Sequence, residues 1–400
     1  MSDRTKLDLI ARIQDALRGE SLDGWLFCSF RGSDPIAANV LGLDRSQIAT
    51  RRWSYYVPAD GEPQKIVHAI ETRVLDALPG RKRVYLPWQE LHREMQDAMS
   101  GASRVAMQYS PLNAIPYISR VDAGTVELVR SFGIDVVSSA DLVQRFEAVW
   151  SRDQLDTHLY AARNLREIVD EAFREVGRRV RKGIAADEFG IQEFIWDQYG
   201  RRGLISSDRP IVAVNAHSAD PHYMPDREHT APIGEGDFLL IDIWARKPDA
   251  GAVYGDITWT GFLGEAVPER HEKIFQIVRA GRDAAIALVR NAHSEGRTLH
   301  GWEVDDAARQ SITAAGYGKQ FIHRTGHSIH EEDHGNGANI DNLETRDDRT
   351  LLEGTCFSIE PGVYLAGDFG VRSEVDVYLG ENGPVVTGTP IQERVVPILR

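Results

Sequence analysis

Four acidic residues in the second half of the chain lie inside apolar, strand-like segments, and this pattern restricts how the chain can fold. They are Asp242, Asp256, Glu360 and Glu374. Asp242, for example, lies within the apolar run Phe238–Trp244. A carboxylate in such a strand is costly to bury unless a cation or hydrogen-bond donors pair with it. Arg372 is close to Glu374 in the sequence, but one guanidinium cannot neutralise four carboxylates. The acids therefore need another source of positive charge.

A histidine-rich segment supplies a second kind of metal ligand. Residues 323–334 contain four histidines and Gly326. Glycine lets the backbone pass close to a site, and a neutral imidazole is a common metal ligand. Four carboxylates and one imidazole suit a pair of divalent ions that share bridging carboxylates and an activated water. The oxygen-rich ligand set favours Mn²⁺, and Zn²⁺ or Co²⁺ would also be accepted.

Hydrophobic periodicity divides the chain into two parts. In residues 1–150, short strand-like runs alternate with helical stretches, which is typical of an α/β domain. The expected strands are Gly24–Phe30, Arg52–Val57, Lys65–Ala69, Val84–Leu86, Val105–Gln108 and Ile134–Val137. The expected helices are 7–17, Trp88–Met99, Ala123–Phe132 and Ala140–Trp150. The segment Arg31–Pro35 predicts a turn.

A long amphipathic helix opens the second part, residues 151–400. Ser151 and Gln154 have the spacing of a capping box, and Gly183 is expected to end the helix. Further helices are expected at Asp187–Tyr199, Glu269–Ala292 and Glu303–Ala314. The expected strands are Ile211–Asn215, Phe238–Trp244, Ala252–Phe262, Thr355–Ile359, Val363–Leu365 and Val371–Leu379.

The acids and histidines occur in motifs that resemble those of the pita-bread metallopeptidases, the family of methionine aminopeptidase, aminopeptidase P and prolidase. The motifs are Asp256-Ile-Thr, Thr325-Gly-His327, Ile359-Glu-Pro-Gly362 and Gly370-Val-Arg-Ser-Glu374. The resemblance implies that two divalent ions per chain are bound by Asp242, Asp256, His327, Glu360 and Glu374. It also implies an α+β fold, with an α/β creatinase-like domain over residues 1–150 and a pita-bread catalytic domain over residues 151–400.

Two further histidines match positions at which this family keeps catalytic histidines. His222 lies in the segment Pro221-His-Tyr223, and His334 follows His327 by seven residues. The resemblance implies that Glu360 shuttles the proton of the bridging water. His222 and His334 would then hydrogen-bond the substrate and the developing oxyanion.

Three more residues are candidates for binding the substrate. Arg372 would either clamp the Glu374 region or bind a substrate carboxylate. Arg346 is placed like the prolidase arginine that binds the C-terminal carboxylate of a dipeptide, and an exposed surface arginine is the alternative. Tyr254, close to Asp256, either contacts the substrate or is a packing aromatic.

The sequence departs from the family pattern at three points. Asp242 and Asp256 are fourteen residues apart, a wider interval than is usual in the family, so the turn at residues 246–251 is expected to be enlarged. Trp259 takes the place of an arginine, and His330 takes the place of a glycine. None of the three removes a ligand, but each changes the expected shape of the pocket.

The charge balance argues against nucleic-acid and membrane-surface partners. Lys and Arg number 46 and Asp and Glu number 60, which gives a net charge of −14. An acidic surface repels phosphate backbones and anionic lipids. No stretch approaches about 18 consecutive apolar residues, and the N-terminus lacks the apolar core of a signal peptide. Cys28 and Cys356 are expected to be buried thiols, which fits a cytoplasmic protein.

The resemblance implies a metal-dependent peptidase that hydrolyses Xaa-Pro bonds, most simply in dipeptides, and that forms a homodimer. The expected partner is thus a small proline-containing peptide. The N-terminal domain favours prolidase over methionine aminopeptidase, which lacks that domain. Aminopeptidase P, which acts on longer Xaa-Pro peptides, is the alternative. A metal-free, creatinase-like hydrolase and a binding protein of the same fold are more distant alternatives, and the five ligands argue against both.

Overall fold

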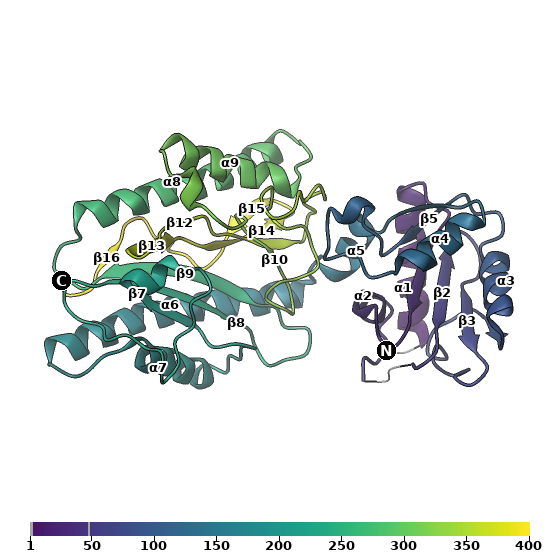
Figure 1. Cartoon of the computed structure of the whole chain (residues 1–400), viewed down its shortest axis with the longest axis horizontal. Coiled ribbons are helices and arrows are strands. Elements are labelled where there is room, and N and C mark those ends of the chain that lie inside the picture. The colour runs from purple at the N-terminus through teal and green to yellow at the C-terminus, as the bar shows by residue number, and fades with distance from the viewer. Residues whose placement is uncertain (1–2, 47–48) are drawn as a thin grey trace. The chain divides into compact units, whose positions relative to one another are not determined.

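The computed structural model describes residues 3–46 and 49–400, and the chain divides into two units, Met1–Glu147 and Ala148–Arg400 (Figure 1). The sequence placed the boundary between its two parts at residue 150, close to this division. No helix in the described part of the chain is both long enough and apolar enough to cross a membrane.

The N-terminal unit is built on a mixed sheet with the strand order β4-β3-β2-β1-β5-β6. The strands are β1 (Gly24–Ser29), β2 (Trp53–Pro58), β3 (Gln64–His68), β4 (Arg81–Tyr85), β5 (Arg104–Met107) and β6 (Asp135–Ser138). β1 runs antiparallel to β2 and parallel to β5. All six strands overlap segments that the periodicity predicts.

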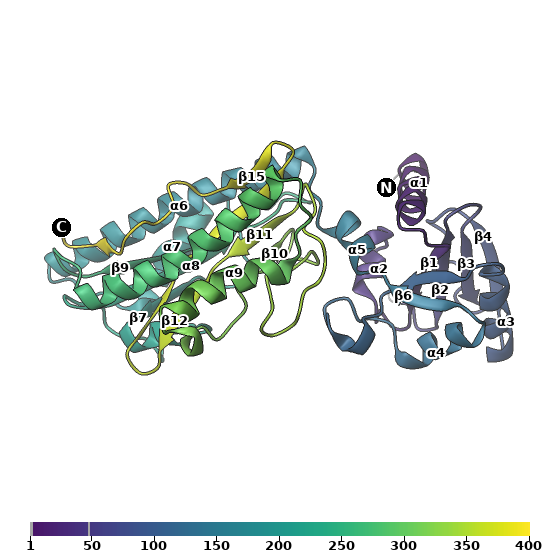
Figure 2. The same cartoon turned by 90° about the horizontal axis from the view of Figure 1, so that it is seen from above.

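Helices cover both faces of this sheet. They are α1 (Asp3–Gly19), α2 (Pro35–Val40), α3 (Trp88–Ala98), α4 (Ala123–Ser131) and α5 (Ala140–Glu147), with a 3₁₀ turn, η1, at Pro111–Asn113. Successive side chains of a strand point to opposite faces. Trp25 of β1 accordingly packs in the same cluster as Ile13 of α1, whereas Leu26 packs in a second cluster with Met95 of α3. Figure 2 shows α1 and α4 on opposite sides of the sheet.

The short helix α2 follows the segment that predicted only a turn. Asp34 is its N-cap, because one carboxylate oxygen accepts a hydrogen bond from the amide of Ala37 at 2.9 Å. Pro35 begins the helix, where its missing N–H costs nothing. Asp34 is 3% exposed, so its carboxylate caps α2 from a buried position within the N-terminal unit.

Two pairs of helices cover the strands of the C-terminal unit, α6 and α7 on one side and α8 and α9 on the other (Figure 1). Their bounds are α6 (Arg152–Arg181), α7 (Glu188–Arg201), α8 (Glu269–Ser294) and α9 (Gly301–Ala314). Leu165 of α6 packs in one apolar cluster with Leu239, and Phe275 of α8 packs in another with Phe357. At the start of α6, the side chains of Ser151 and Gln154 form the predicted capping box.

The strands of this unit form two four-stranded sheets and a two-stranded one. The first sheet has the order β16-β9-β8-β7, the second β10-β11-β14-β15, and β12 pairs with β13. The bounds are β7 (Ile211–Val214), β8 (Phe238–Ala245), β9 (Gly255–Phe262), β10 (Ser328–Ile329), β11 (Cys356–Ile359), β12 (Gly362–Leu365), β13 (Phe369–Arg372), β14 (Val375–Gly380), β15 (Gly383–Val386) and β16 (Val396–Pro397). Two 3₁₀ turns complete the unit, η2 (Asn215–Ala219) and η3 (Gly318–Gln320).

The predicted strand Val371–Leu379 is in fact two strands in different sheets. β13 ends at Arg372 and β14 begins at Val375, so Ser373 and Glu374 lie between them. Both side chains have partners outside these strands: Ser373 accepts a hydrogen bond from Arg282, and Glu374 accepts one from Thr258. These tertiary contacts break a run that appears continuous in the sequence.

Candidate metal centre

Two aspartates share one face of the hairpin formed by β8 and β9. The strands are antiparallel, with Asp242 opposite Thr258 and Trp244 opposite Asp256. Directly opposite residues point to the same face, and so do residues two apart on one strand. Asp242 and Asp256 are therefore diagonal neighbours on that face, and both are buried.

The break between β13 and β14 brings Glu374 to the same face. Its Oε2 atom accepts a hydrogen bond of 2.7 Å from the Thr258 hydroxyl. Asp376, two residues further on, accepts a hydrogen bond of 2.8 Å from the backbone N–H of Asp256. Glu374 and Asp376 are both buried, so these contacts fix the second sheet against the hairpin at this point.

His327 and Glu360 come from the neighbouring ends of β10 and β11. The Ser358 hydroxyl accepts from the backbone N–H of His327 at 3.0 Å and donates to Glu360 Oε1 at 3.2 Å. His327 Nε2 lies 3.4 Å from Glu360 Oε1 and 3.7 Å from Asp256 Oδ2. With its proton on Nδ1, 3.3 Å from the Ser328 carbonyl, the ring keeps Nε2 as a ligand atom.

The residues present fit divalent metal ions. Ligand atoms of Asp256, His327 and Glu374 all lie within 4.8 Å of one another. Within the described residues, Asp242 Oδ1, Asp256 Oδ1 and Glu374 Oε1 are buried without a hydrogen-bond partner. Buried oxygens without donors are rare in folded proteins. Carboxylate oxygens beside an imidazole nitrogen are a donor set that Mn²⁺, Zn²⁺ and Co²⁺ accept.

Burial also explains the pKa shifts of the proposed ligands. Burial, reinforced by neighbouring carboxylates, raises the pKa values of Asp256 and Glu374 well above the ordinary range. Burial also raises the pKa of Glu360 to about 7. Burial lowers the pKa of His327, so its imidazole is neutral, which is the form that binds a metal. Divalent cations would favour the ionised carboxylates and reverse their shifts.

Arg372 lies among the ligands. Its guanidinium pairs with Asp242 Oδ2, and its Nε donates to the Thr258 hydroxyl at 3.1 Å. The same guanidinium lies 3.9 Å from Glu360 and donates to Tyr364 Oη at 3.1 Å. Of the two roles that the sequence allowed, these contacts favour the clamp on the ligand group, although through Asp242 and Thr258 rather than Glu374 directly.

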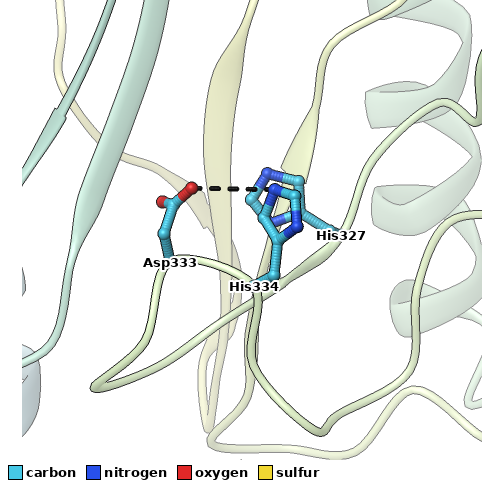
Figure 3. A group of neighbouring side chains, drawn as sticks. All are labelled: His327, Asp333 and His334. Carbon is cyan, nitrogen blue, oxygen red and sulfur yellow. Dashed lines mark ion pairs between the residues drawn. The ribbon is translucent and has the colours of Figure 1, made fainter. Parts of the chain in front are cut away.

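Of the two catalytic candidates, His334 lies beside a ligand, and His222 is near enough to His334 to interact with it electrostatically. The ring of His334 lies 4.1 Å from that of His327, centroid to centroid (Figure 3). His222 interacts electrostatically with His334, and the preceding residue, Pro221, offers its carbonyl to Arg372 at 3.5 Å. Both histidines are exposed, so they can meet a substrate that enters from solvent.

Arg346 and Tyr254 have other surroundings. Arg346 is exposed, and its guanidinium lies 4.8 Å from the ring centroid of Trp302. Tyr254 is buried in an apolar cluster with Trp150 and Val253, and its hydroxyl accepts from the Ser207 amide at 3.1 Å. Among the described residues, 3–46 and 49–400, no hydrogen bond or ion pair joins either side chain to the ligand group. These contacts favour the alternatives that Tyr254 is a packing aromatic and that Arg346 is an exposed surface arginine.

Besides Asp376, three residues near the ligands were not predicted from the sequence. Tyr364 connects His323 to Arg372, because its hydroxyl lies 2.8 Å from His323 Nε2. Arg324 interacts electrostatically with Glu360 and with Asp333, and burial raises the pKa of Asp333 to about 8. Arg324 and Tyr364 each lie within four residues of a motif ligand, which was a usable signal. Asp333 belongs to an acidic run that resembles an ordinary exposed loop.

Comparisons with known proteins agree with this geometry. The family model "Metallopeptidase family M24" matches residues 161–381. A "Probable dipeptidase PepE" of Mycobacterium bovis is 27% identical over 375 residues, 88% of each chain. An "Xaa-Pro dipeptidase" of Lactobacillus delbrueckii subsp. lactis is 30% identical over 245 residues, which are 61% of this chain and 62% of that protein.

Solved structures of similar fold extend over nearly the whole chain. The crystal structure of dipeptidase PepE from Mycobacterium ulcerans superposes with a TM-score of 0.71 at 22% identity and covers 99% of both chains. The prolidase from Pyrococcus horikoshii OT3 gives a TM-score of 0.59 at 19% identity, over 97% of this chain and all of that one. These matches confirm the expected fold, an N-terminal mixed α/β domain followed by a pita-bread domain.

Proposed function

The chain belongs to metallopeptidase family M24, and from that premise we propose that it hydrolyses the Xaa-Pro bond of dipeptides. The observation that carries the proposal is the buried group of carboxylates around His327, three of which have an oxygen without a hydrogen-bond partner among the described residues. The similarity to a dipeptidase over 88% of both chains supports a dipeptide substrate. The similarity to an Xaa-Pro dipeptidase supports proline as the second residue.

Five residues would hold two divalent ions in this proposal, with Mn²⁺ preferred and Zn²⁺ or Co²⁺ accepted. They are Asp242, Asp256, His327, Glu360 and Glu374. Bound there, the ions would polarise the scissile carbonyl and lower the pKa of the attacking water. Arg372 keeps Asp242 in place, and the Thr258 hydroxyl keeps Glu374 in place.

Glu360 is the proposed proton shuttle, and two histidines are proposed to bind the reacting groups. The Glu360 carboxylate lies within the ligand group, with Oε1 3.4 Å from His327 Nε2, so it would be placed to take the proton of a metal-activated water and to pass it on. The exposed side chains of His222 and His334 would donate hydrogen bonds to the substrate and to the developing oxyanion. Arg346 and Tyr254 remain proposals for substrate contacts from the family resemblance alone. Their contacts in the structure do not add support for that role.

The experiment that tests the proposal compares Ala-Pro with Ala-Pro-Ala on metal-stripped protein reloaded with Mn²⁺, Zn²⁺ or Co²⁺. We expect cleavage of the dipeptide, abolished by chelator and restored by metal. Cleavage of the tripeptide alone would make the protein an aminopeptidase P. Activity that is unaffected by chelator, in protein without bound metal, would instead support the metal-free creatinase-like alternative.

We also propose that the protein is a homodimer, which rests on the family resemblance alone. Light scattering at micromolar concentration tests this proposal. A monomer at that concentration would contradict it without affecting the assignment of the metal centre.

A further inference from the structure

A fifth acidic residue, Asp333, lies beside the four acidic ligands that the motifs identify. It follows β10 in the segment His330–His334. Its carboxyl group is close enough to Asp256, Asp242 and Glu360 to interact electrostatically with all three. Its Oδ2 atom lies 3.7 Å from His334 Nε2, and Figure 3 shows the carboxylate directed toward the rings of His327 and His334.

Asp333 also belongs to a second cluster of potential ligand atoms. Atoms of His327, Asp333 and His334 lie within 4.8 Å of one another, as do those of Asp256, His327 and Glu374. Asp333 Oδ1 is buried and has no hydrogen-bond partner in the described part of the chain. This oxygen is therefore in the same situation as the orphaned oxygens of Asp242, Asp256 and Glu374.

The two clusters share His327, and this decides how they are related. His327 Nδ1 faces the Ser328 carbonyl, so Nε2 is its available ligand atom. One nitrogen lone pair binds one ion. Asp256 and Glu360 have oxygens 3.7 Å and 3.4 Å from His327 Nε2, and a ligand atom of Asp333 lies within 4.8 Å of a ring nitrogen of His327. One ion held by His327 would therefore be within reach of all three carboxylates.

We propose that Asp333 is an additional carboxylate ligand of the ion held by His327, beyond the five ligands that the motifs identify. The local charge permits a fifth carboxylate. Arg372 and Arg324 place two positive charges near the group, and two divalent ions would add four. Because Asp333 lies next to His334, the extra ligand is on the side of the group from which substrate would approach.

Metal binding by the full-length protein tests this role without relying on activity. Metal-free protein is titrated with Mn²⁺ by calorimetry, and the Co²⁺ form is examined by visible absorption, which reports coordination number. We expect Asp333→Asn to weaken one of the two ions about tenfold or more, to leave the other unchanged, and to change the Co²⁺ spectrum. The matched control is Glu331→Gln, which removes the same charge from an exposed position of the same loop and should bind both ions as the wild type does.

The outcomes separate this role from a general charge effect and from a substrate contact. The proposal is overturned if Asp333→Asn binds both ions with wild-type affinity and spectrum, or if it and Glu331→Gln weaken both ions equally. A higher KM with unchanged metal binding would also overturn it, since Asp333 would then bind the substrate amine. If Asp333→Asn does not fold, Asp333→Ser is measured instead, and the same losses are expected because it too lacks the carboxylate.

This inference rests on the proposed metal centre, and different results would contradict the metal centre and the role of Asp333. Wild-type protein that binds no divalent ion would overturn the proposed function as well. Wild-type protein that binds two ions, with a variant indistinguishable from it, would overturn the role of Asp333 alone.

Discussion

At the scale of single residues, the hydroxyl group of Thr258 connects two parts of the metal centre. It donates to Glu374 Oε2 at 2.7 Å and accepts from Arg372 Nε at 3.1 Å, and it is fully buried. Arg372 in turn pairs with Asp242. One oxygen atom thus holds Glu374 directly and Asp242 through Arg372, although it is not itself expected to touch an ion.

Replacing Thr258 by valine should weaken metal binding. Valine has the same shape but neither donates nor accepts, so Glu374 and Arg372 would lose a shared partner. Changes of this kind beside a ligand cost about 10- to 100-fold in metal affinity. Calorimetric titration with Mn²⁺ measures the loss. Thr258→Ser keeps the hydroxyl and serves as the control, and equal losses in both variants would mean that packing, not the hydrogen bonds, is responsible.

Asp34 offers a prediction about pH that is independent of metal. Burial raises its pKa from 3.8 to about 7. Between pH 4 and pH 7 the folded state therefore binds a proton that the unfolded state has released, so the free energy of unfolding falls as the pH rises through that window. Asparagine is neutral and caps a helix equally well.

We accordingly expect Asp34→Asn to leave stability near pH 4 unchanged and to raise it at pH 8 by roughly 2–4 kcal/mol. Urea unfolding of the N-terminal unit, followed at both pH values, provides the measurement. A variant that is less stable than the wild type at pH 8 would show that the ionised carboxylate is the better cap, contrary to this reasoning.

At the scale of secondary-structure elements, Gly326 sets the distance between the segment that bears His327 and β11. A Cβ atom at this position would lie 2.0 Å from the Ser358 carbonyl oxygen. The amide and carbonyl of Gly326 both bond to Ile340 on the other side, so the segment cannot move away freely. His327 and Glu360 can approach each other because no side chain separates their backbones.

Gly326→Ala should therefore damage both stability and metal binding. Overpacking of this kind costs about 1–3 kcal/mol or more, and moving β11 would separate Glu360 from His327. Thermal unfolding and Mn²⁺ titration are the measurements. Gly200→Ala is a suitable control, since a Cβ in this exposed part of α7 meets nothing within 4 Å and alanine favours a helix. Wild-type metal affinity in Gly326→Ala would contradict the argument.

The elements show what sequence patterns can and cannot predict here. The capping box at Ser151 predicted the start of α6, because it depends only on residues three apart. The break at Glu374 was not predictable, because it depends on Thr258, which is distant in the sequence. The ligands on apolar strands were recognisable because an acid is unusual there. Asp333 lies in an acidic run, and only the folded loop determines which of its side chains points toward the ligands. The partners of Arg372 likewise depend on strand register.

At the scale of the whole molecule, the chain consists of two units, each with its own hydrophobic clusters. The clusters of α1 and α3 lie within the N-terminal unit, and those of α6 and α8 lie within the C-terminal unit. The proposed ligands all belong to the C-terminal unit. A ligand that binds only the folded state stabilises the unit that carries its site by RT ln(1 + [L]/Kd).

Metal should consequently stabilise the two units unequally. At a free Mn²⁺ concentration one hundred times the Kd, the expected gain for the C-terminal unit is about 2.7 kcal/mol per ion, and the N-terminal unit should gain nothing. Differential scanning calorimetry, with and without Mn²⁺, should show two transitions of which only one moves to higher temperature. In Asp256→Asn, which lacks a proposed ligand, that shift should be much reduced. If both transitions moved together in the wild type, the units would unfold as one cooperative body, and the stability of the N-terminal unit would then depend on the metal centre.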